Sequence, residues 1–210
     1  NGIESSAVGF YATANGDGAS AFGAEALAEG QTATAVGFQS VAGADYATAV
    51  GGWAEALAAN STAVGNSAIA FASNSAAIGA DAWAMGDSST ALGQGSTAEG
   101  MATTALGQGA EAVGDYATAV GKSALADGVS SVAMGEYSEA LGAESVAIGG
   151  TAYGMINVRA AGDGATALGA GAWAAGDQSS ALGWMATADG LNATAVGAGA
   201  WAEADDSMAI

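Results

Sequence analysis

The side chains that could do chemistry in this sequence are almost all carboxylates. The chain contains 21 Asp and Glu residues, two Lys or Arg residues, no His and no Cys. Paired carboxylates, such as Glu136 and Glu139, can serve in general acid–base catalysis. Nothing in the sequence sets such a pair beside a nucleophile or a pocket-forming segment. We therefore predict that the chain is not an enzyme and has no catalytic residues and no cofactor.

Cation binding by Asp is a second candidate chemistry. The strings GDGAS and GDGAT resemble calcium-binding nonapeptide repeats, and a cation could relieve repulsion between Asp163 and Asp177. The spacing in this chain is not nine residues, however, and Asp after Gly or Ala suits a turn in which its side chain accepts backbone hydrogen bonds. We predict that turn role and no metal site. The Asp residues in this position are Asp17, Asp45, Asp87, Asp115, Asp163, Asp177 and Asp205.

The charge balance excludes two classes of partner. The net charge is -19, and Lys122 and Arg159 are the only basic side chains. Neutralising nucleic-acid phosphates or anionic lipids requires clusters of Lys and Arg, so neither a nucleic acid nor a bare membrane surface is expected as a partner. No apolar run of about 18 residues is present. Because the sequence starts at Asn1, we expect a fragment whose membrane anchor lies outside it.

The elements that must position these side chains follow from a repeat. Aligning the tripeptides AVG, ALG and AIG places a Gly every fourteen residues, which is typical of a repeat architecture. We number the repeat positions as slots one to fourteen, with this Gly in slot fourteen. The slot-fourteen residues are Gly9, Gly23, Gly37, Gly51, Gly65, Gly79, Gly93, Gly107, Gly121, Gly135 and Gly149, and then Gly169, Gly183 and Gly197.

Each repeat divides into two halves of seven residues that read as short β-strands. Slots five and twelve hold Ala in every copy, and slots three and ten hold Ala or Ser, with Val158 and Thr103 as exceptions. Small residues at period two indicate one face of a strand, and these faces must point inward. A helix is excluded because Gly recurs too often and no apolar stripe of period 3.6 is present. We predict an all-β, parallel β-roll (solenoid) of 14-residue coils.

The two outward faces of the predicted roll differ. Slots four and six vary freely and include several acidic residues, whereas slot thirteen is a large apolar residue in every coil. We call the slot-thirteen residues the apolar column. A soluble monomer rarely exposes such a stripe, so we predict self-association along it, as a dimer or a trimer. The predicted interface comprises Val8, Phe22, Val36, Val50, Val64, Ile78, Leu92, Leu106, Val120, Met134, Ile148, Leu168, Leu182 and Val196.

The segments NSTAVG (60–65), NSAAIG (74–79) and ESVAIG (144–149) resemble the YadA-like head of trimeric autotransporter adhesins. The likeness extends over essentially the whole chain. It implies a left-handed parallel β-roll, assembled as a parallel homotrimer with two further copies of itself, in which the strand resembling SVAIG faces the threefold axis. It also implies a bacterial cell-surface location, with a stalk and an outer-membrane anchor in a C-terminal region outside this fragment. Such virulence-associated heads bind host matrix proteins such as collagen or fibronectin, cells, or abiotic surfaces.

One departure from the period falls between Gly149 and Gly169, where twenty residues replace fourteen. The segment GTAYGM (150–155) is interpreted as a six-residue insertion, because residues 156–169 return to register. Solenoids accommodate such insertions at the corners of their coils. We therefore predict a single head domain over residues 1–210 with an insertion at 150–155. Whether this insertion binds anything stays open.

Large apolar residues in slots four and six of neighbouring coils form a candidate contact site, which we call the outer island. It comprises Leu57, Ile69, Phe71, Trp83 and Met85. Exposed apolar clusters often mark partner-binding sites. Stacked large residues in neighbouring coils can also simply cover one another and stabilise the sheet. The outer island is thus a candidate partner-binding patch with a structural alternative.

Three functions are compatible with the pattern. The first is an adhesin head, a non-catalytic rod that attaches to matrix proteins, cells or surfaces. The second is an ice-binding solenoid, because Thr34, Thr48, Thr62 and later Thr residues form ranks in slot eleven. This alternative is weakened by the apolar slot thirteen beside each Thr, which favours burial. The third is a passive spacer without a ligand, which the regularity alone would satisfy.

Overall fold

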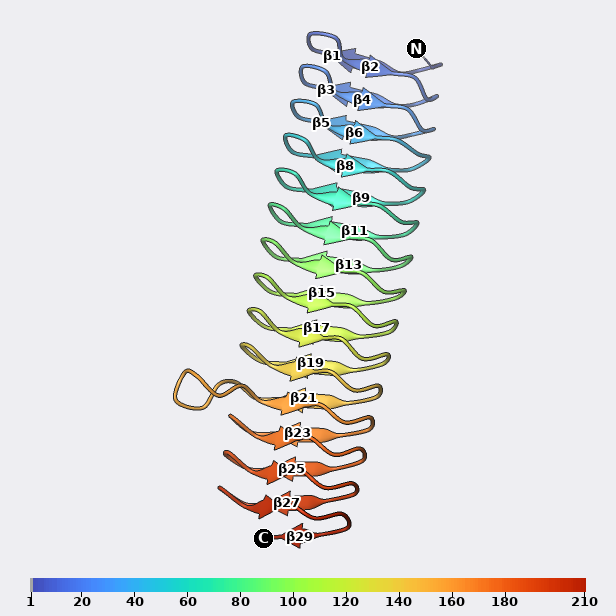
Figure 1. Ribbon diagram of the computed structural model, residues 1–210. Coiled ribbons are helices and arrows are strands. Elements are labelled where there is room, and N and C mark those ends of the chain that lie inside the picture. Colours follow the sequence, from blue (N-terminus) through green and yellow to red (C-terminus); the bar gives the residue numbers. More distant parts are fainter. Residues whose placement is uncertain (1) are drawn as a thin grey trace. The chain divides into compact units, whose positions relative to one another are not determined.

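The fold is built entirely from short strands in the computed structural model, which describes residues 2–210. No helix that could cross a membrane occurs among these residues. The chain divides into two compact units, the first ending at Ala102 and the second spanning Thr103–Ile210. In each unit the chain winds through successive coils, and every coil contributes one strand to each of two facing sheets (Figure 1).

The first unit contains fourteen of the strands, each pairing in parallel with its counterparts in the adjacent coils. One sheet has the order β1 (Ser6–Val8), β3 (Ser20–Phe22), β5 (Thr34–Val36), β7 (Thr48–Val50), β9 (Thr62–Val64), β11 (Ala76–Ile78) and β13 (Thr90–Leu92). The other has the order β2 (Thr13–Ala14), β4 (Leu27–Ala28), β6 (Val41–Ala42), β8 (Glu55–Ala56), β10 (Ile69–Ala70), β12 (Trp83–Ala84) and β14 (Thr97–Ala98).

The second unit repeats this arrangement. One sheet has the order β15 (Thr104–Leu106), β17 (Thr118–Val120), β19 (Val132–Met134), β21 (Val146–Ile148), β23 (Thr166–Leu168), β25 (Ser180–Leu182), β27 (Thr194–Val196) and β29 (Met208–Ala209). The other has the order β16 (Glu111–Ala112), β18 (Leu125–Ala126), β20 (Glu139–Ala140), β22 (Arg159–Ala160), β24 (Trp173–Ala174), β26 (Thr187–Ala188) and β28 (Trp201–Ala202).

The register follows the fourteen-residue period. Ala77 of β11 pairs with Ala63 on one side and with Ala91 on the other, and all three occupy slot twelve. Backbone hydrogen bonds continue around the corners, as where Gly51 N donates to Val36 O at 2.8 Å. The parallel β-solenoid with 14-residue coils predicted from the sequence is therefore confirmed. The homotrimer and the single-domain organisation stay predictions.

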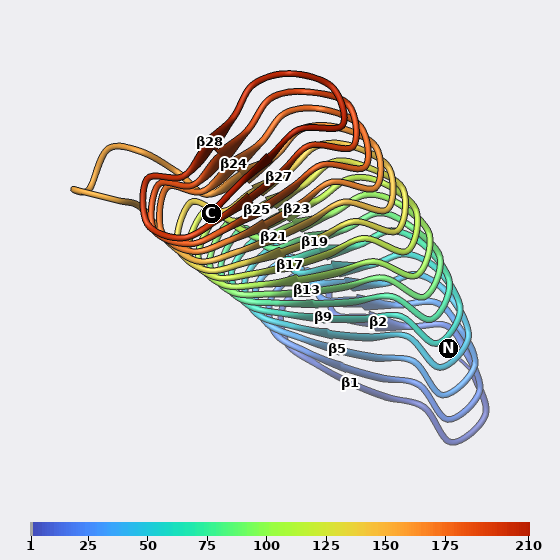
Figure 2. The same cartoon turned by 90° about the horizontal axis from the view of Figure 1, so that it is seen from below.

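The core of each coil is a thin layer of Ala and Ser side chains. Seen along the stack, each coil is a flattened loop whose two strands face each other (Figure 2). Ala residues of slots five and twelve, such as Ala84 and Ala91, are completely buried between them. Val158 and Thr103 are the largest fully buried side chains in the described part of the chain. Each coil therefore buries little apolar surface, and inter-coil backbone hydrogen bonds carry much of the order.

The corners of the coils depend on residues with positive φ. Slots two and nine adopt the left-handed conformation even when they are not Gly, as at Trp53 (φ 55°) and Asn74 (φ 59°). Slot fourteen needs Gly for a different reason. Gly121 has φ +135°, and a Cβ atom there would lie 2.4 Å from the carbonyl oxygen of Gly135 in the next coil. The tripeptide Gly is thus fixed by the close stacking of successive coils.

The six extra residues leave the stack without disturbing its register. Glu139 pairs with Arg159, and Ile148 pairs with Leu168, so both sheets continue in phase on either side of the longer coil. The intervening chain projects as a small loop, coloured orange in Figures 1 and 2. It closes through an antiparallel bridge in which Ala152 N donates to Ile156 O at 2.7 Å.

Candidate functional site

The apolar column lies on the outward face of one sheet in each unit. Its members end the three-residue strands, and the register sets each beside the next, as with Val64, Ile78 and Leu92. The exposed fraction runs from 36% at Val196 to 60% at Val8 among the most exposed members, which are Val8, Phe22, Ile78, Leu92, Leu106, Met134, Leu168 and Val196. The half-buried members are Val36, Val50, Val64, Val120, Ile148 and Leu182.

The slot-eleven residues run beside the apolar column on the same face. Thr34, Thr48, Thr62, Thr90 and Thr104 begin their strands and are half-buried. Each Thr is therefore flanked, two residues later, by an aliphatic side chain that points to the same side of the sheet. This face is mixed in polarity along most of its strands, but β11, β19 and β21 carry Ala or Val in slot eleven.

The outer island lies on the opposite sheet of the first unit. Ile69 of β10 pairs directly with Trp83 of β12, while Phe71 and Met85 each follow such a strand by one residue. Phe71 is 61% exposed, Trp83 is 46% exposed and Met85 is 44% exposed, whereas Leu57 and Ile69 are half-buried. The structure thus leaves three large apolar side chains accessible on this wall.

The recurrent Asp residues connect successive coils. Asp17 Oδ1 accepts a hydrogen bond from Ile3 N at 2.7 Å, and Asp45 Oδ1 accepts one from Gln31 N at 2.8 Å. Asp177 accepts one in the same way from Asp163 N at 3.0 Å. These carboxylates accept backbone hydrogen bonds, as the sequence predicts, but their donors belong to the preceding coil. Within residues 2–210 no group of three or more His, Cys, Asp or Glu side chains could hold a metal ion.

A row of side chains at one corner was not anticipated from the sequence. Trp53 Nε1 donates to Gln39 Oε1 at 2.6 Å, and Gln39 Nε2 donates to Glu25 Oε2 at 2.6 Å. Phe38 packs edge-on against Trp53, with the ring centroids 5.3 Å apart. All four residues occupy slots one and two, so listing side chains by slot at the corners as well as on the strands would have revealed the row.

Lys122 occupies the corresponding corner of the second unit. Its Nζ lies 3.3 Å from Glu136 Oε1 and 5.3 Å from the ring centroid of Tyr137. Hydrogen bonds to Tyr137 and then to Glu136 raise the pKa of Lys122 above its ordinary value. Lys122 is therefore paired with Glu136 and Tyr137, on a chain whose net charge is -19.

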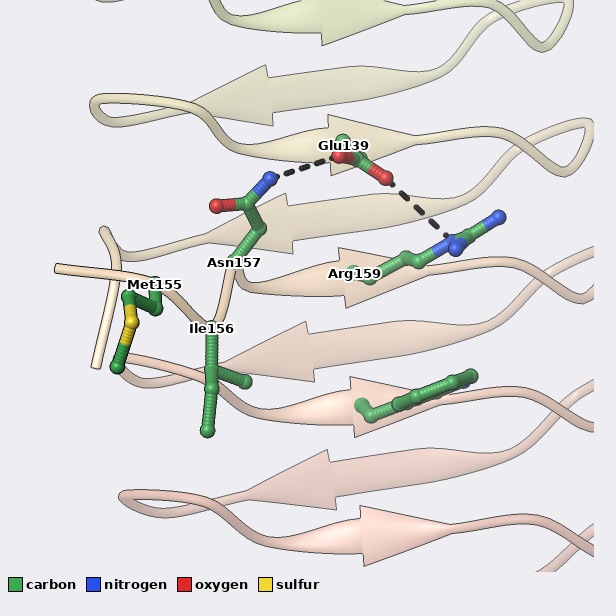
Figure 3. Close-up of a pocket in the computed structure, with 6 residues that line it drawn as sticks. Glu139, Met155, Ile156, Asn157 and Arg159 are labelled. Carbon is green, nitrogen blue, oxygen red and sulfur yellow. Dashed lines mark hydrogen bonds and ion pairs between the residues drawn. The ribbon is translucent and has the colours of Figure 1, made fainter. Parts of the chain in front are cut away.

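A hollow of about 230 Å³ lies in the second unit, where the chain returns from the insertion to the sheet. Glu139, Arg159 and Trp173 contribute to it from slot four of successive coils, and the chain leaving the loop supplies Met155, Ile156 and Asn157 (Figure 3). We call it the insertion hollow. Glu139, Arg159 and Trp173 share slot four, which is the one signal of this site in the sequence; the path of the loop that adds Met155, Ile156 and Asn157 does not follow from the period.

The loop beside the insertion hollow is packed against the following coils. Ala152 is 2% exposed, and a Cβ atom at Gly171 would lie 2.7 Å from its Cβ atom. The ring of Tyr153 meets that of Trp184 edge-on at 5.3 Å. These contacts give the loop a defined position next to Trp173, on the wall formed by slots four and six.

Coils of fourteen residues, an Ala core and an exposed aliphatic column define a non-helical β-solenoid of repeat type. The comparison with protein families agrees with this class. The YadA head domain repeat (2 copies) matches residues 1–26, 28–52, 56–82, 84–110, 100–124, 126–152, 160–185 and 188–210. The chain therefore belongs to the YadA head repeat family. Among curated proteins no significant match was found.

Proposed function

We propose that this chain is the head of a trimeric bacterial surface adhesin, assembled with two further copies of itself. Membership of the YadA head family implies an adhesin-like role. The observation that carries the assembly is the apolar column, since one sheet face presents a large apolar residue in every coil while the other face is irregular and mixed in polarity. Burying the column between chains supplies apolar contacts that the Ala core lacks.

The proposal assigns attachment to the wall formed by slots four and six. In a trimer closed along the apolar column this wall faces outward, and it carries the outer island in the first unit. The partner class is an extracellular matrix protein such as collagen or fibronectin, and the location is the outer surface of a bacterial cell. The chain acts by binding and has no catalytic role in this proposal.

Attachment through the outer island is tested with a double variant, Phe71→Ser with Trp83→Ser. Removing two exposed aromatic side chains eliminates much of the apolar contact area, so we expect at least a roughly tenfold loss of affinity for immobilised collagen or fibronectin. The matched control is Phe38→Ser with Trp53→Ser, which removes the same residue types from the corner row. Surface plasmon resonance of the assembled protein provides the measurement.

Three results would contradict this assignment. Unchanged binding by the outer-island variant would remove the island from the contact surface. An equal loss in the corner variant would indicate a general effect on the fold. Thermal hysteresis by the unmodified protein, without matrix binding, would favour the ice-binding alternative based on the slot-eleven Thr ranks.

A further inference from the structure

The insertion hollow combines features that the rest of the wall formed by slots four and six lacks. It holds Arg159, the only Arg of the chain, next to a Trp ring and an amide side chain. The sheet forms its floor, and the loop that follows Tyr153 closes one end with Met155 and Ile156 (Figure 3). All of its lining residues belong to the second unit.

Three planar polar side chains form one network in the insertion hollow. Asn157 Nδ2 donates to Glu139 Oε1 at 2.8 Å, and Arg159 Nε lies 3.5 Å from Glu139 Oε2. The second contact is an ion pair without a hydrogen bond, so the buried Arg159 Nε has no hydrogen-bond partner among the described residues. Glu139 thus orients both neighbours, while hydrogen-bonding capacity remains on the guanidinium, the carboxylate and the Asn oxygen.

The apolar side of the insertion hollow is accessible. Trp173 is 45% exposed and lies beneath the guanidinium of Arg159, whose Cζ atom is 5.8 Å from the ring centroid. Ile156 is 37% exposed and Met155 is 82% exposed. A ligand here meets an aromatic ring and aliphatic groups on one side and paired donors and acceptors on the other, the usual composition of a small-molecule site.

Charge and size narrow the chemical class of the ligand. The charges of Arg159 and Glu139 compensate each other, and the chain carries a net charge of -19, so an anionic ligand would be repelled at long range. The hollow of about 230 Å³ ends at the loop, so it suits a ring-sized group better than an extended peptide. Neutral sugar rings have vicinal hydroxyl groups that suit planar donors and acceptors, and C–H faces that pack on aromatic rings.

We propose that the insertion hollow binds a neutral saccharide unit, with Trp173 contacting the ring and Asn157, Glu139 and Arg159 bonding its hydroxyl groups. This inference deepens the proposed adhesive function, on which it rests, by assigning the second unit a glycan ligand. It concerns a surface separate from the outer island, so the two sites can be tested independently.

The test measures binding of the assembled protein to neutral oligosaccharides ending in glucose, galactose or mannose, by calorimetry and on a glycan array. At least one neutral ligand should bind, and Trp173→Ala or Asn157→Ala should weaken it by about tenfold or more, since each removes a central contact. Trp201→Ala is the matched control, because Trp201 also occupies slot four and is 66% exposed. Trp173→Phe should restore part of the affinity.

Four results would overturn the inference: no binding of any neutral oligosaccharide, an equal loss in the Trp201 control, preference for sialylated or uronic-acid ligands, or occupation of the hollow by a triple-helical collagen peptide instead. Circular dichroism of each variant verifies that the fold is retained. Because matrix binding is measured separately on the outer-island variants, failure of saccharide binding is distinguishable from failure of the adhesin proposal.

Discussion

At the residue scale, the small side chains of this protein allow its coils to lie close together. Fully buried Ala residues such as Ala112 and Ala126 keep the facing strands near each other, and Gly in slot fourteen removes the one atom that would separate successive coils. Some polar side chains then form hydrogen bonds with the backbone. The Asp carboxylates at the corners accept hydrogen bonds from backbone amides of the preceding coil.

Replacing one such carboxylate should loosen a single corner. Asp87 Oδ1 accepts a hydrogen bond from Ser73 N at 3.1 Å, so Asp87→Ala should speed hydrogen exchange of the Ser73 amide by roughly fivefold to tenfold, as expected for loss of a bond contributing about 1 kcal/mol. Asp87→Asn keeps an oxygen acceptor and is the control. Exchange is measured by NMR, and equal rates in all three proteins would contradict the assigned role.

At the element scale, the corners of the coils use two kinds of residue. Residues in slots two and nine adopt the left-handed conformation, whereas slot fourteen is a Gly that lies against the next coil. Slots two and nine hold Trp, Tyr and Asn in the left-handed region, and these side chains are exposed. Slot fourteen does not have this freedom, since its backbone lies against the next coil. A Gly in slot two and a Gly in slot fourteen should therefore respond differently to the same substitution.

Gly107 and Gly109 provide that comparison within one corner. A Cβ atom on Gly107 would lie 2.4 Å from Gly121 O at φ +140°, so Gly107→Ala should lower the free energy of unfolding by at least about 3 kcal/mol. Gly109 has φ +61° and only Ser123 Oγ nearby, so Gly109→Ala should cost about 1 kcal/mol. Urea denaturation followed by circular dichroism compares them, and similar losses would refute the stacking argument.

The elements show what the sequence could and could not predict. The strands, their parallel register and the Ala core follow from the period, because fixed small slots allow only one side of each strand to face inward. The insertion hollow was missed, since Asn157 and Ile156 reach it only through the path of the loop, which the period does not determine. The slot numbering places Trp53, Gln39 and Glu25 in one row, but only their side-chain rotamers decide which hydrogen bonds join them.

At the scale of the whole molecule, the apolar column and the negative charge act in opposite directions. The column favours association of identical chains through aliphatic contacts, whereas a net charge of -19 on each chain opposes it. Salt screens the repulsion but not the apolar contacts, so the proposed assembly should become more stable as the ionic strength rises.

Introducing charge into the column should prevent this assembly. Leu106→Asp with Leu168→Asp places two carboxylates among exposed aliphatic groups, and we expect the mass in sedimentation equilibrium to fall from three chains to one. The control, Leu125→Asp with Leu141→Asp, makes the same change on the opposite wall and should leave the proposed trimer intact. A stable monomer of the unsubstituted protein would contradict the proposed association along the apolar column. Dissociation of the control variant alone would contradict it as well.

The uniform register also bears on how such a protein changes length. Within the second unit, Val120 pairs with Met134, and Met134 pairs with Ile148, through identical slots. Loss or duplication of one fourteen-residue stretch would join equivalent neighbours again, so whole repeats can be removed or added without changing the register. Segments of other lengths persist only when, like the six residues before Ile156, they leave the stack as a loop. The number of coils therefore changes independently of the side chains that the variable slots and the loop expose.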